Sequence, residues 1–249
     1  MAQTDRETTA ARLARLPDPA SVIEEAELIS PRGTKYRVLK TSELDPYERP
    51  LAAEEVPTAG AARLTPGDNF AGTDRRDAKL SIANAPTEQF DDLQNLVGTL
   101  TADSKMIDHK PPLTTAPGCQ RVTEEVRNVR VRAFLYAASR EADNDFHFIV
   151  GRDTSLSPTY MNMELSGLPP STSPAFNKLD TARTSYKTFI KGQLPGAGYH
   201  HYDPPIPIEV QGSLFFDITH AQGPHPGPAQ LRPKTIWEVH PISDIVFEP

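Results

Sequence analysis

Proline is the feature that most limits what this chain can fold into. There are 25 prolines among its 249 residues, about twice the average usage of roughly 5%. Each one removes a backbone N–H donor and is poorly tolerated inside a helix or a central strand. A long helical bundle, a coiled coil and a solenoid of helix pairs are therefore excluded.

Charge and hydropathy limit the partners that the chain can take. The net charge is −7, from 26 basic and 33 acidic residues, which opposes general binding to phosphate backbones and makes duplex DNA a poor partner. No stretch approaches the roughly 18 consecutive apolar residues that a membrane span needs. We therefore expect no membrane insertion, while a small ligand, an oligonucleotide or a protein segment remains open as a partner.

Cysteine usage and the first residues indicate a compartment. Cys119 is the only cysteine, which excludes an intrachain disulfide and a cysteine zinc cluster. Residues 1–7 lack the apolar core of a signal peptide. Together these features predict a cytoplasmic, reducing location.

The first 110 residues show only short periodic segments. A short helix is predicted before Pro17, and alternation in Glu24–Ile29 and Lys35–Leu39, on either side of a Ser-Pro-Arg-Gly turn, predicts a β-hairpin. Residues 41–82 have no sustained period and are interpreted as loop, whereas Glu88–Val97 has the spacing of an amphipathic helix. We interpret residues 1–110 as an irregular, proline-rich extension.

Residues 111–249 are better organised and are interpreted as one β-rich domain. Alternating apolar residues predict five strands, which are Glu125–Ala138, Asp145–Arg152, Tyr160–Leu165, Ile206–Ile218 and Thr235–Phe247. Between the third and fourth strands, Leu179–Lys191 has a helical apolar face. This order matches an OB-fold, a five-stranded Greek-key barrel, and Gly212 in mid-strand suits a bend or bulge. The alternative is an antiparallel sheet with one helix on its face.

Three strings in this half carry a resemblance. They are Glu141-Ala-Asp-Asn-Asp145-Phe-His147, Gly212-Ser-Leu-Phe-Phe-Asp217-Ile-Thr-His220 and Trp237-Glu238-Val-His240-Pro241. In this order, over about 110 residues, they resemble a group of uncharacterised bacterial proteins with a C-terminal OB-like β-barrel domain. The resemblance implies a small β-rich domain and no established activity, and it does not extend to residues 1–120.

Histidines and carboxylates lie on or near the ends of the predicted strands. The candidates for a divalent metal site are His147, Glu164, His220, Glu238 and His240, with Asp143, Asp145 and Asp217 nearby. Side chains two residues apart on a strand share a face, so Glu238 and His240 point the same way. Such a set would bind a divalent cation that could activate water. The alternative is a structural network of buried hydrogen bonds.

A second set of residues suggests ligand binding. Basic and aromatic side chains alternate on one face of the first long strand, namely Arg130, Arg132, Phe134 and Tyr136. Interleaved arginines and aromatics are used by platforms for single-stranded nucleic acid. Tyr199 and Tyr202 flank two histidines and could stack on a base or sugar. The alternatives are a sheet face covered by the N-terminal segment and a solvent-exposed loop.

Three functions follow from these patterns. The first is an OB-like module that binds an oligonucleotide, an oligosaccharide or a protein segment. The second is a metal-dependent hydrolase or nuclease that uses the histidine–carboxylate set. The third is a structural or assembly protein with the proline-rich segment as its contact arm. The absence of Gly-x-Ser-x-Gly, P-loop and His-Glu-x-x-His motifs disfavours the enzyme classes that those motifs define.

Overall fold

A computed structural model of the protein describes residues 8–46 and 67–249. The eight strands are β1 (Val22–Ile29), β2 (Lys35–Thr41), β3 (Thr87–Phe90), β4 (Asn128–Arg140), β5 (Phe146–Gly151), β6 (Tyr160–Leu165), β7 (His200–Phe216) and β8 (Trp237–Phe247). The α-helices are α1 (Thr9–Arg15), α2 (Arg76–Lys79), α3 (Leu93–Val97), α4 (Asp103–Ile107) and α5 (Phe176–Ile190). Within these ranges no helix is both long and apolar enough to span a membrane.

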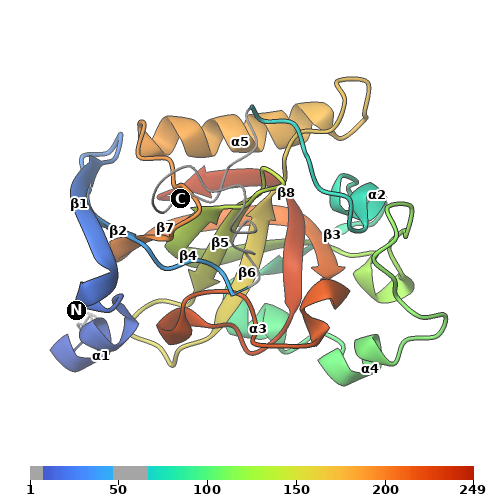
Figure 1. Ribbon diagram of the computed structural model, residues 1–249, viewed down its shortest axis with the longest axis horizontal. Coiled ribbons are helices and arrows are strands. Elements are labelled where there is room, and N and C mark those ends of the chain that lie inside the picture. The colour runs from blue at the N-terminus through green and yellow to red at the C-terminus, as the bar shows by residue number, and fades with distance from the viewer. Residues whose placement is uncertain (1–7, 47–66) are drawn as a thin grey trace, which may run out of the picture.

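All eight strands belong to one sheet, in the order β1-β2-β7-β8-β6-β5-β4-β3. Two pairings are parallel, β3 with β4 and β6 with β8, and the others are antiparallel. β7 also pairs with β4, so β4, β5, β6, β8 and β7 each pair with two others of this group. The long helix α5 packs beside β8 on one side of the sheet (Figure 1).

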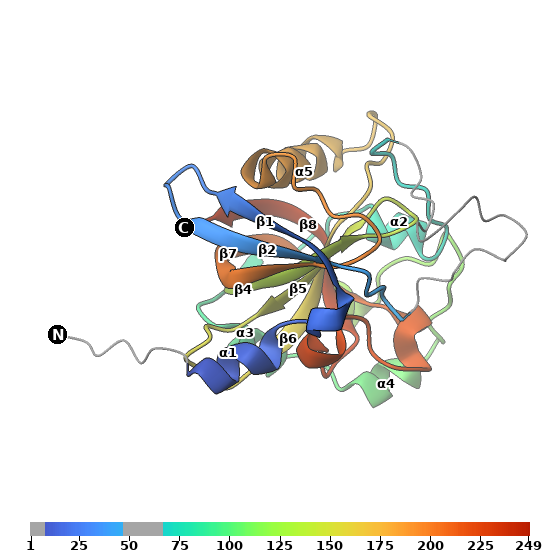
Figure 2. The same cartoon turned by 60° about the vertical axis from the view of Figure 1, so that its left-hand side comes forward.

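The mainly β class is confirmed, but the five-stranded OB barrel is wrong. The expectation counted only the strands of residues 111–249, whereas the hairpin β1–β2 adds to one edge of the sheet through β2 and β7. β3 adds to the other edge through its parallel pairing with β4, while Figure 2 shows β1 and β2 running beside β7. The described part of residues 1–110 thus supplies three strands, and the sheet does not divide at residue 110.

Predictions of individual hairpins and helices were more accurate than the predicted arrangement of the strands. The hairpin forms as expected, with Gly33 at φ 87° in its turn. The helix α5 begins three residues before its predicted start and ends where Lys191 adopts φ 46°. The predicted helix over 88–97 is only half right, because backbone pairing with β4 draws its first residues into β3. Of the predicted loop 41–82, residues 47–66 lie outside the described residues, and α2 forms within the rest.

Strand β7 is longer than the sequence indicates. The segment around His200 and His201 was expected to be a loop, because Pro204 and Pro205 follow it, yet it pairs with both β2 and β4. The two prolines fall between the paired stretches of β7, where no ladder N–H is needed. Pairing can therefore continue on both sides of them.

Gly212 marks a bulge in β7, as its position in mid-strand predicted. The register of β7 against β8 shifts on both sides of this residue. A Cβ atom at Gly212 would lie 2.4 Å from the carbonyl oxygen of Pro241 and 2.5 Å from Cγ1 of Val239. Only glycine lets the two backbones approach so closely.

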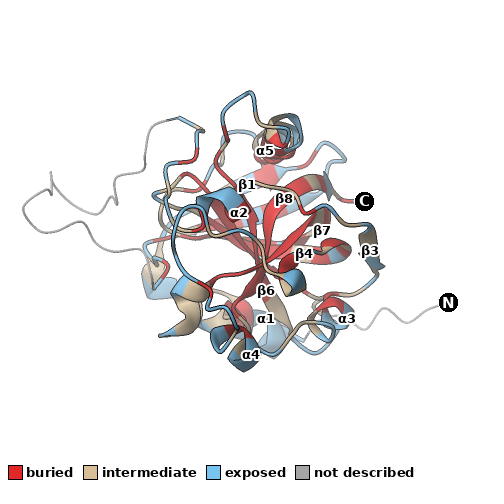
Figure 3. Cartoon of the chain, turned by 90° about the vertical axis from the view of Figure 1, so that its right-hand side faces the viewer, coloured by how far each residue is buried: buried red, intermediate tan, exposed pale blue. Residues whose placement is uncertain are grey.

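The main hydrophobic core is built on the sheet. Figure 3 shows the strands as buried and the surrounding helices and loops as more exposed. The buried face of α5 closes one side of this core, through Ala182, Tyr186, Phe189 and Ile190. A smaller apolar cluster lies elsewhere on the sheet and includes Tyr136, Ile149 and Tyr199. Between these apolar groups the strands also bury a set of charged side chains.

A candidate metal centre in the sheet interior

Three neighbouring strands place the candidate metal ligands together. His147 on β5 and Glu164 on β6 lie directly opposite each other in antiparallel register. β6 is flanked on its other side by β8, which carries Glu238 and His240. Directly opposed residues share a face of the sheet, as do residues two apart on one strand. β6 therefore brings its glutamate between the two histidine-bearing strands.

His240 lies at the centre of the first group of contacts. Its Nδ1 atom lies 2.9 Å from Oε2 of Glu164 and 3.1 Å from Oε1 of Glu238. Its Nε2 atom lies 3.4 Å from Oδ2 of Asp145. The side chains of these four residues are at most 1% exposed. One imidazole is thus surrounded by three carboxylates in the interior of the protein.

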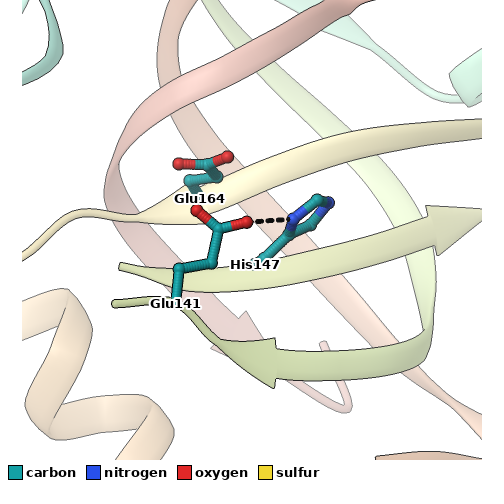
Figure 4. Close-up of side chains that lie close together, drawn as sticks. All are labelled: Glu141, His147 and Glu164. Atoms are coloured by element: carbon teal, nitrogen blue, oxygen red, sulfur yellow. Dashed lines mark hydrogen bonds and ion pairs between the residues drawn. The ribbon is translucent and has the colours of Figure 1, made fainter. Parts of the chain in front are cut away.

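His147 lies at the centre of the second group. Its Nδ1 atom forms a 2.7 Å hydrogen bond with Oε1 of Glu141, while Glu164 lies above this pair on the neighbouring strand (Figure 4). Oδ2 of Asp45 lies 4.0 Å from the same nitrogen. The side chain of Glu141 is 18% exposed, whereas that of His147 is fully buried. Glu141 is therefore the member of this group closest to solvent.

We call Glu141, Asp145, His147, Glu164, Glu238 and His240 the buried polar cluster. The predicted residue His220 is not among its members. Nδ1 of His220 lies 3.8 Å from Asp217, whose carboxylate lies 3.7 Å from Nζ of Lys79. Lys79 is 7% exposed, and its charge acts on Asp217, Glu164 and Asp145. His220 thus belongs to a neighbouring ion-pair group.

Several cluster atoms have no hydrogen-bond partner among the described residues. They are Oδ2 of Asp145, Nε2 of His147, Oε2 of Glu164, Oε2 of Glu238 and Nε2 of His240, although the contacts of His240 with Glu164 and Asp145 qualify as ion pairs. Buried polar atoms in native proteins are almost always hydrogen-bonded or bound to an ion. A bound cation or a buried water is the kind of partner that satisfies such atoms.

The pKa values show the electrostatic cost of this arrangement. Burial, together with the charge of Glu164, raises the pKa of Glu141 to about 8. Burial likewise raises the pKa values of Asp145 and Glu238 well above the usual range. Burial also disfavours the charged form of Glu164, but His240 and Lys79 hold its pKa well below the usual range. Without a bound cation, several of these carboxyl groups would hold protons at neutral pH.

Two triads of ligands have the spacing of a metal site. One consists of Glu141, His147 and Glu164, and the other of Asp145, Glu164 and His240. In each triad, one ligand atom per residue lies within 4.8 Å of the others. Imidazole nitrogen and carboxylate oxygen are the donors that Zn²⁺ and related divalent ions use in proteins. The side chains present thus fit a divalent transition-metal ion.

The predicted arginine and aromatic face is not an open platform. Arg130 forms ion pairs of 2.6 Å with Glu209 and 2.9 Å with Asp244, and Arg132 lies 3.3 Å from Glu209. Phe134 is half-buried and packs against the smaller apolar cluster. Tyr136 is buried, with its hydroxyl donating to the carbonyl of Arg152. The arginines are thus neutralised by strand neighbours, and the ring of Tyr136 is covered.

The two tyrosines near His200 are also unsuited to stacking on a ligand. Tyr199 is fully buried and donates a 2.8 Å hydrogen bond to Oδ2 of Asp45. Tyr202 is 1% exposed, and its hydroxyl lies 3.2 Å from that of Tyr186 on α5. The sequence predicted exposure because this segment looked like a loop. Its pairing with β2 and β4 buries both rings instead.

Some residues around the cluster escaped the sequence analysis. Asp45 and Lys79 come from the segment without periodicity, so no local pattern placed them near β5 or β8. Glu141 could have been predicted, because it begins the same short sequence string that ends in His147. Asp145 lies in the same string, and its Oδ1 atom accepts a hydrogen bond from the backbone N–H of Gly167.

Comparison of the chain with protein-family models, curated proteins and solved structures found no match.

Proposed function

We propose that this protein binds a divalent transition-metal ion, Zn²⁺ or Mn²⁺, through Asp145, Glu164 and His240. The observation that supports the proposal is the convergence of buried donor atoms that have no hydrogen-bond partner among the described residues. A cation at this position would bind the side chains of Asp145, Glu164 and His240, each of which has such an atom. Mixed imidazole and carboxylate ligands suit Zn²⁺ and Mn²⁺ better than Ca²⁺, which takes oxygen ligands only.

Charge supports the same proposal. Glu141, Asp145, Glu164 and Glu238 bring four carboxylates together, whereas the fixed cations that act on them are Lys79 and Arg121. Burying an ionised carboxylate without a counter-charge costs several kcal/mol even after the protein relaxes. A divalent ion would offset this cost and displace the protons that the carboxyl groups otherwise hold.

The enclosure of the cluster favours a retained cation over hydrolysis of a polymer. A hydrolytic metal needs an open coordination position and access for its substrate. Only Glu141 among the six cluster residues exceeds 1% exposure, at 18% of its side chain. The binding of an oligonucleotide or oligosaccharide is disfavoured for a related reason, since the aromatic rings that would stack on it are largely covered.

The test is to measure metal retention and thermal stability together. The purified protein is stripped with a chelator, dialysed against Zn²⁺ or Mn²⁺, desalted and analysed by inductively coupled plasma mass spectrometry. We expect retained metal and a raised melting temperature, since a ligand at 100 times its dissociation constant adds about 2.7 kcal/mol. His240→Asn and Asp145→Asn should both abolish the metal-dependent stabilisation.

His225→Asn is the matched control, because His225 lies outside the cluster and its ring Nδ1 contacts the carbonyl of Pro233. This variant should retain metal as the wild type does. Absence of retained metal in the wild-type protein, or equal retention by His240→Asn and His225→Asn, would contradict the proposal. The cluster would then be a hydrogen-bonded and ion-paired structural network.

A further inference from the structure

The two ligand triads of the buried polar cluster have one residue in common. Glu164 belongs both to the triad with Glu141 and His147 and to the triad with Asp145 and His240. The remaining ligands are different residues from different segments of the chain. Two complete sets of donors are therefore present, and they meet at a single carboxylate.

The sheet explains why Glu164 occupies this position. It lies on β6, which pairs with β5 on one side and with β8 on the other. His147 lies opposite it on β5, and the ring of His240 on β8 lies 2.9 Å from its Oε2 atom. A carboxylate has two oxygens and can bind a separate cation through each. Glu164 is placed to do so between two imidazoles.

The first triad does not account for the whole cluster. A single cation held by Asp145, Glu164 and His240 would not involve Glu141 or His147. Nδ1 of His147 faces Oε1 of Glu141 at 2.7 Å (Figure 4), and with Glu164 these atoms form the second ligand triad.

The number of carboxylates also favours two cations. Glu141, Asp145, Glu164 and Glu238 carry four negative charges when ionised, which equals the charge of two divalent ions, while Lys79 lies 3.7 Å from Asp217 outside the cluster. Carboxylate-rich sites that hold two metal ions place them about 3.5–4 Å apart.

We infer that the cluster is a dinuclear centre, in which a second divalent cation binds to Glu141 and His147 and Glu164 bridges the two ions. This inference rests on the proposed function, since it adds a cation to the one held by Asp145, Glu164 and His240. The partial exposure of Glu141 gives the second cation a route from solvent. We expect it to be the more readily exchanged of the two.

The test counts metal ions per chain and asks whether they interact. The full chain is loaded with Mn²⁺, desalted, and examined by plasma mass spectrometry and by electron paramagnetic resonance. Two Mn²⁺ per chain with a spin-coupled spectrum are expected for the wild type. His147→Asn and Glu141→Gln should each reduce the count to one and give the spectrum of isolated Mn²⁺. Because Glu141 is partly exposed, its variant serves if His147→Asn fails to fold.

The outcomes separate this inference from the proposed function. One Mn²⁺ per chain, unaffected by Glu141→Gln and lost in Asp145→Asn, would overturn the dinuclear centre and leave the proposed function intact. Two Mn²⁺ without spin coupling would overturn the bridging role of Glu164. No retained Mn²⁺ or Zn²⁺ would overturn both proposals.

Discussion

Arg75 and Glu125 form a two-pronged ion pair in the interior of the protein, with both nitrogen–oxygen distances at 2.7 Å. Their side chains are 1% and 0% exposed. The same glutamate accepts the backbone N–H of Phe216 at the end of β7, and Arg75 donates to the carbonyl of that residue. This pair therefore fastens the segment before α2 to the end of the longest strand.

Loss of this ion pair should be strongly destabilising. Glu125→Gln leaves the guanidinium of Arg75 buried without its counter-charge, and removing one partner of a buried pair typically costs about 3–5 kcal/mol. Urea denaturation at neutral pH measures the change. Arg132→Gln is the control, because the exposed pair with Glu209 should contribute less than about 1 kcal/mol. Equal effects of the two substitutions would contradict the role assigned to Arg75 and Glu125.

The C-terminal part should depend on the N-terminal part for its stability. The sequence suggested that residues 111–249 form a separate domain, but the sheet takes β1, β2 and β3 from the residues before them. Tyr36 also donates a 2.7 Å hydrogen bond to Glu248. We expect a fragment of residues 111–249 to give a poorly dispersed amide NMR spectrum, while the full chain gives a dispersed one. A well-dispersed fragment spectrum would show that the first three strands are dispensable.

Gly212→Ala should disturb the bulge in β7. Its new Cβ would meet the backbone of Pro241, which cannot move away as a flexible side chain could. Overpacking of this kind typically costs about 1–3 kcal/mol. Gly196→Ala is the control, since no atom lies within 4 Å of a Cβ built there. Thermal unfolding of the two variants should place Gly212→Ala clearly below both the wild type and Gly196→Ala.

Stability should fall in mild acid because of His201. This side chain is 1% exposed, and neither ring nitrogen has a hydrogen-bond partner among the described residues. Burial, with a smaller effect of His200, lowers the pKa of His201 from 6.5 to about 4. Between pH 6.5 and pH 4 the folded state therefore binds fewer protons than the unfolded state. The contribution of neutral His201 to the free energy of unfolding is complete above pH 6.5 and is lost as the pH falls toward 4.

The shift in the pKa of His201 corresponds to a contribution of about 3 kcal/mol. Free energies of unfolding measured between pH 7 and pH 4.5 should decline less steeply in His201→Gln than in the wild type. His109→Gln is the control, because that histidine lies outside the strands, with its ring against the carbonyl of Pro111. Parallel pH profiles for the wild type and His201→Gln would rule out this origin of acid sensitivity.

Single-stranded oligonucleotides should bind weakly, if at all. Arg130 and Arg132 are already paired with acidic neighbours on the sheet, and the net charge is −7. We expect fluorescence anisotropy to show weak binding that disappears as salt is raised. Arg130→Gln combined with Arg132→Gln should change it little. Tight, salt-resistant binding that this double variant abolishes would restore the arginine face as a binding site.

Much of the local structure is predictable because backbone geometry imposes a period on the sequence. Alternating side chains identified β4, β5, β6 and β8, and the apolar face identified α5, with errors of a few residues at their ends. The same period of two placed Glu238 and His240 on one face of β8. These relationships lie within single helices or strands, so the residues of one segment are enough to predict them.

The assembly of the site depends on pairings between distant parts of the chain. The approach of Glu164 to both His147 and His240 requires β6 to lie between β5 and β8, and the parallel pairing of β6 with β8 joins residues more than 70 positions apart. Asp45 and Lys79 reach the cluster from segments that show no periodicity. A local pattern cannot specify which distant strand will be its neighbour.

The sequence by itself therefore determined the mainly β class, the helix before β7 and the residue types from which a polar site could be built. Only the tertiary structure decided that eight strands share one sheet, that Tyr199 and Tyr202 are buried, and that Glu164 belongs to two ligand triads. The physical reason is that periodicity reflects the geometry of one backbone segment. Burial and the convergence of charges depend instead on which segments pack together.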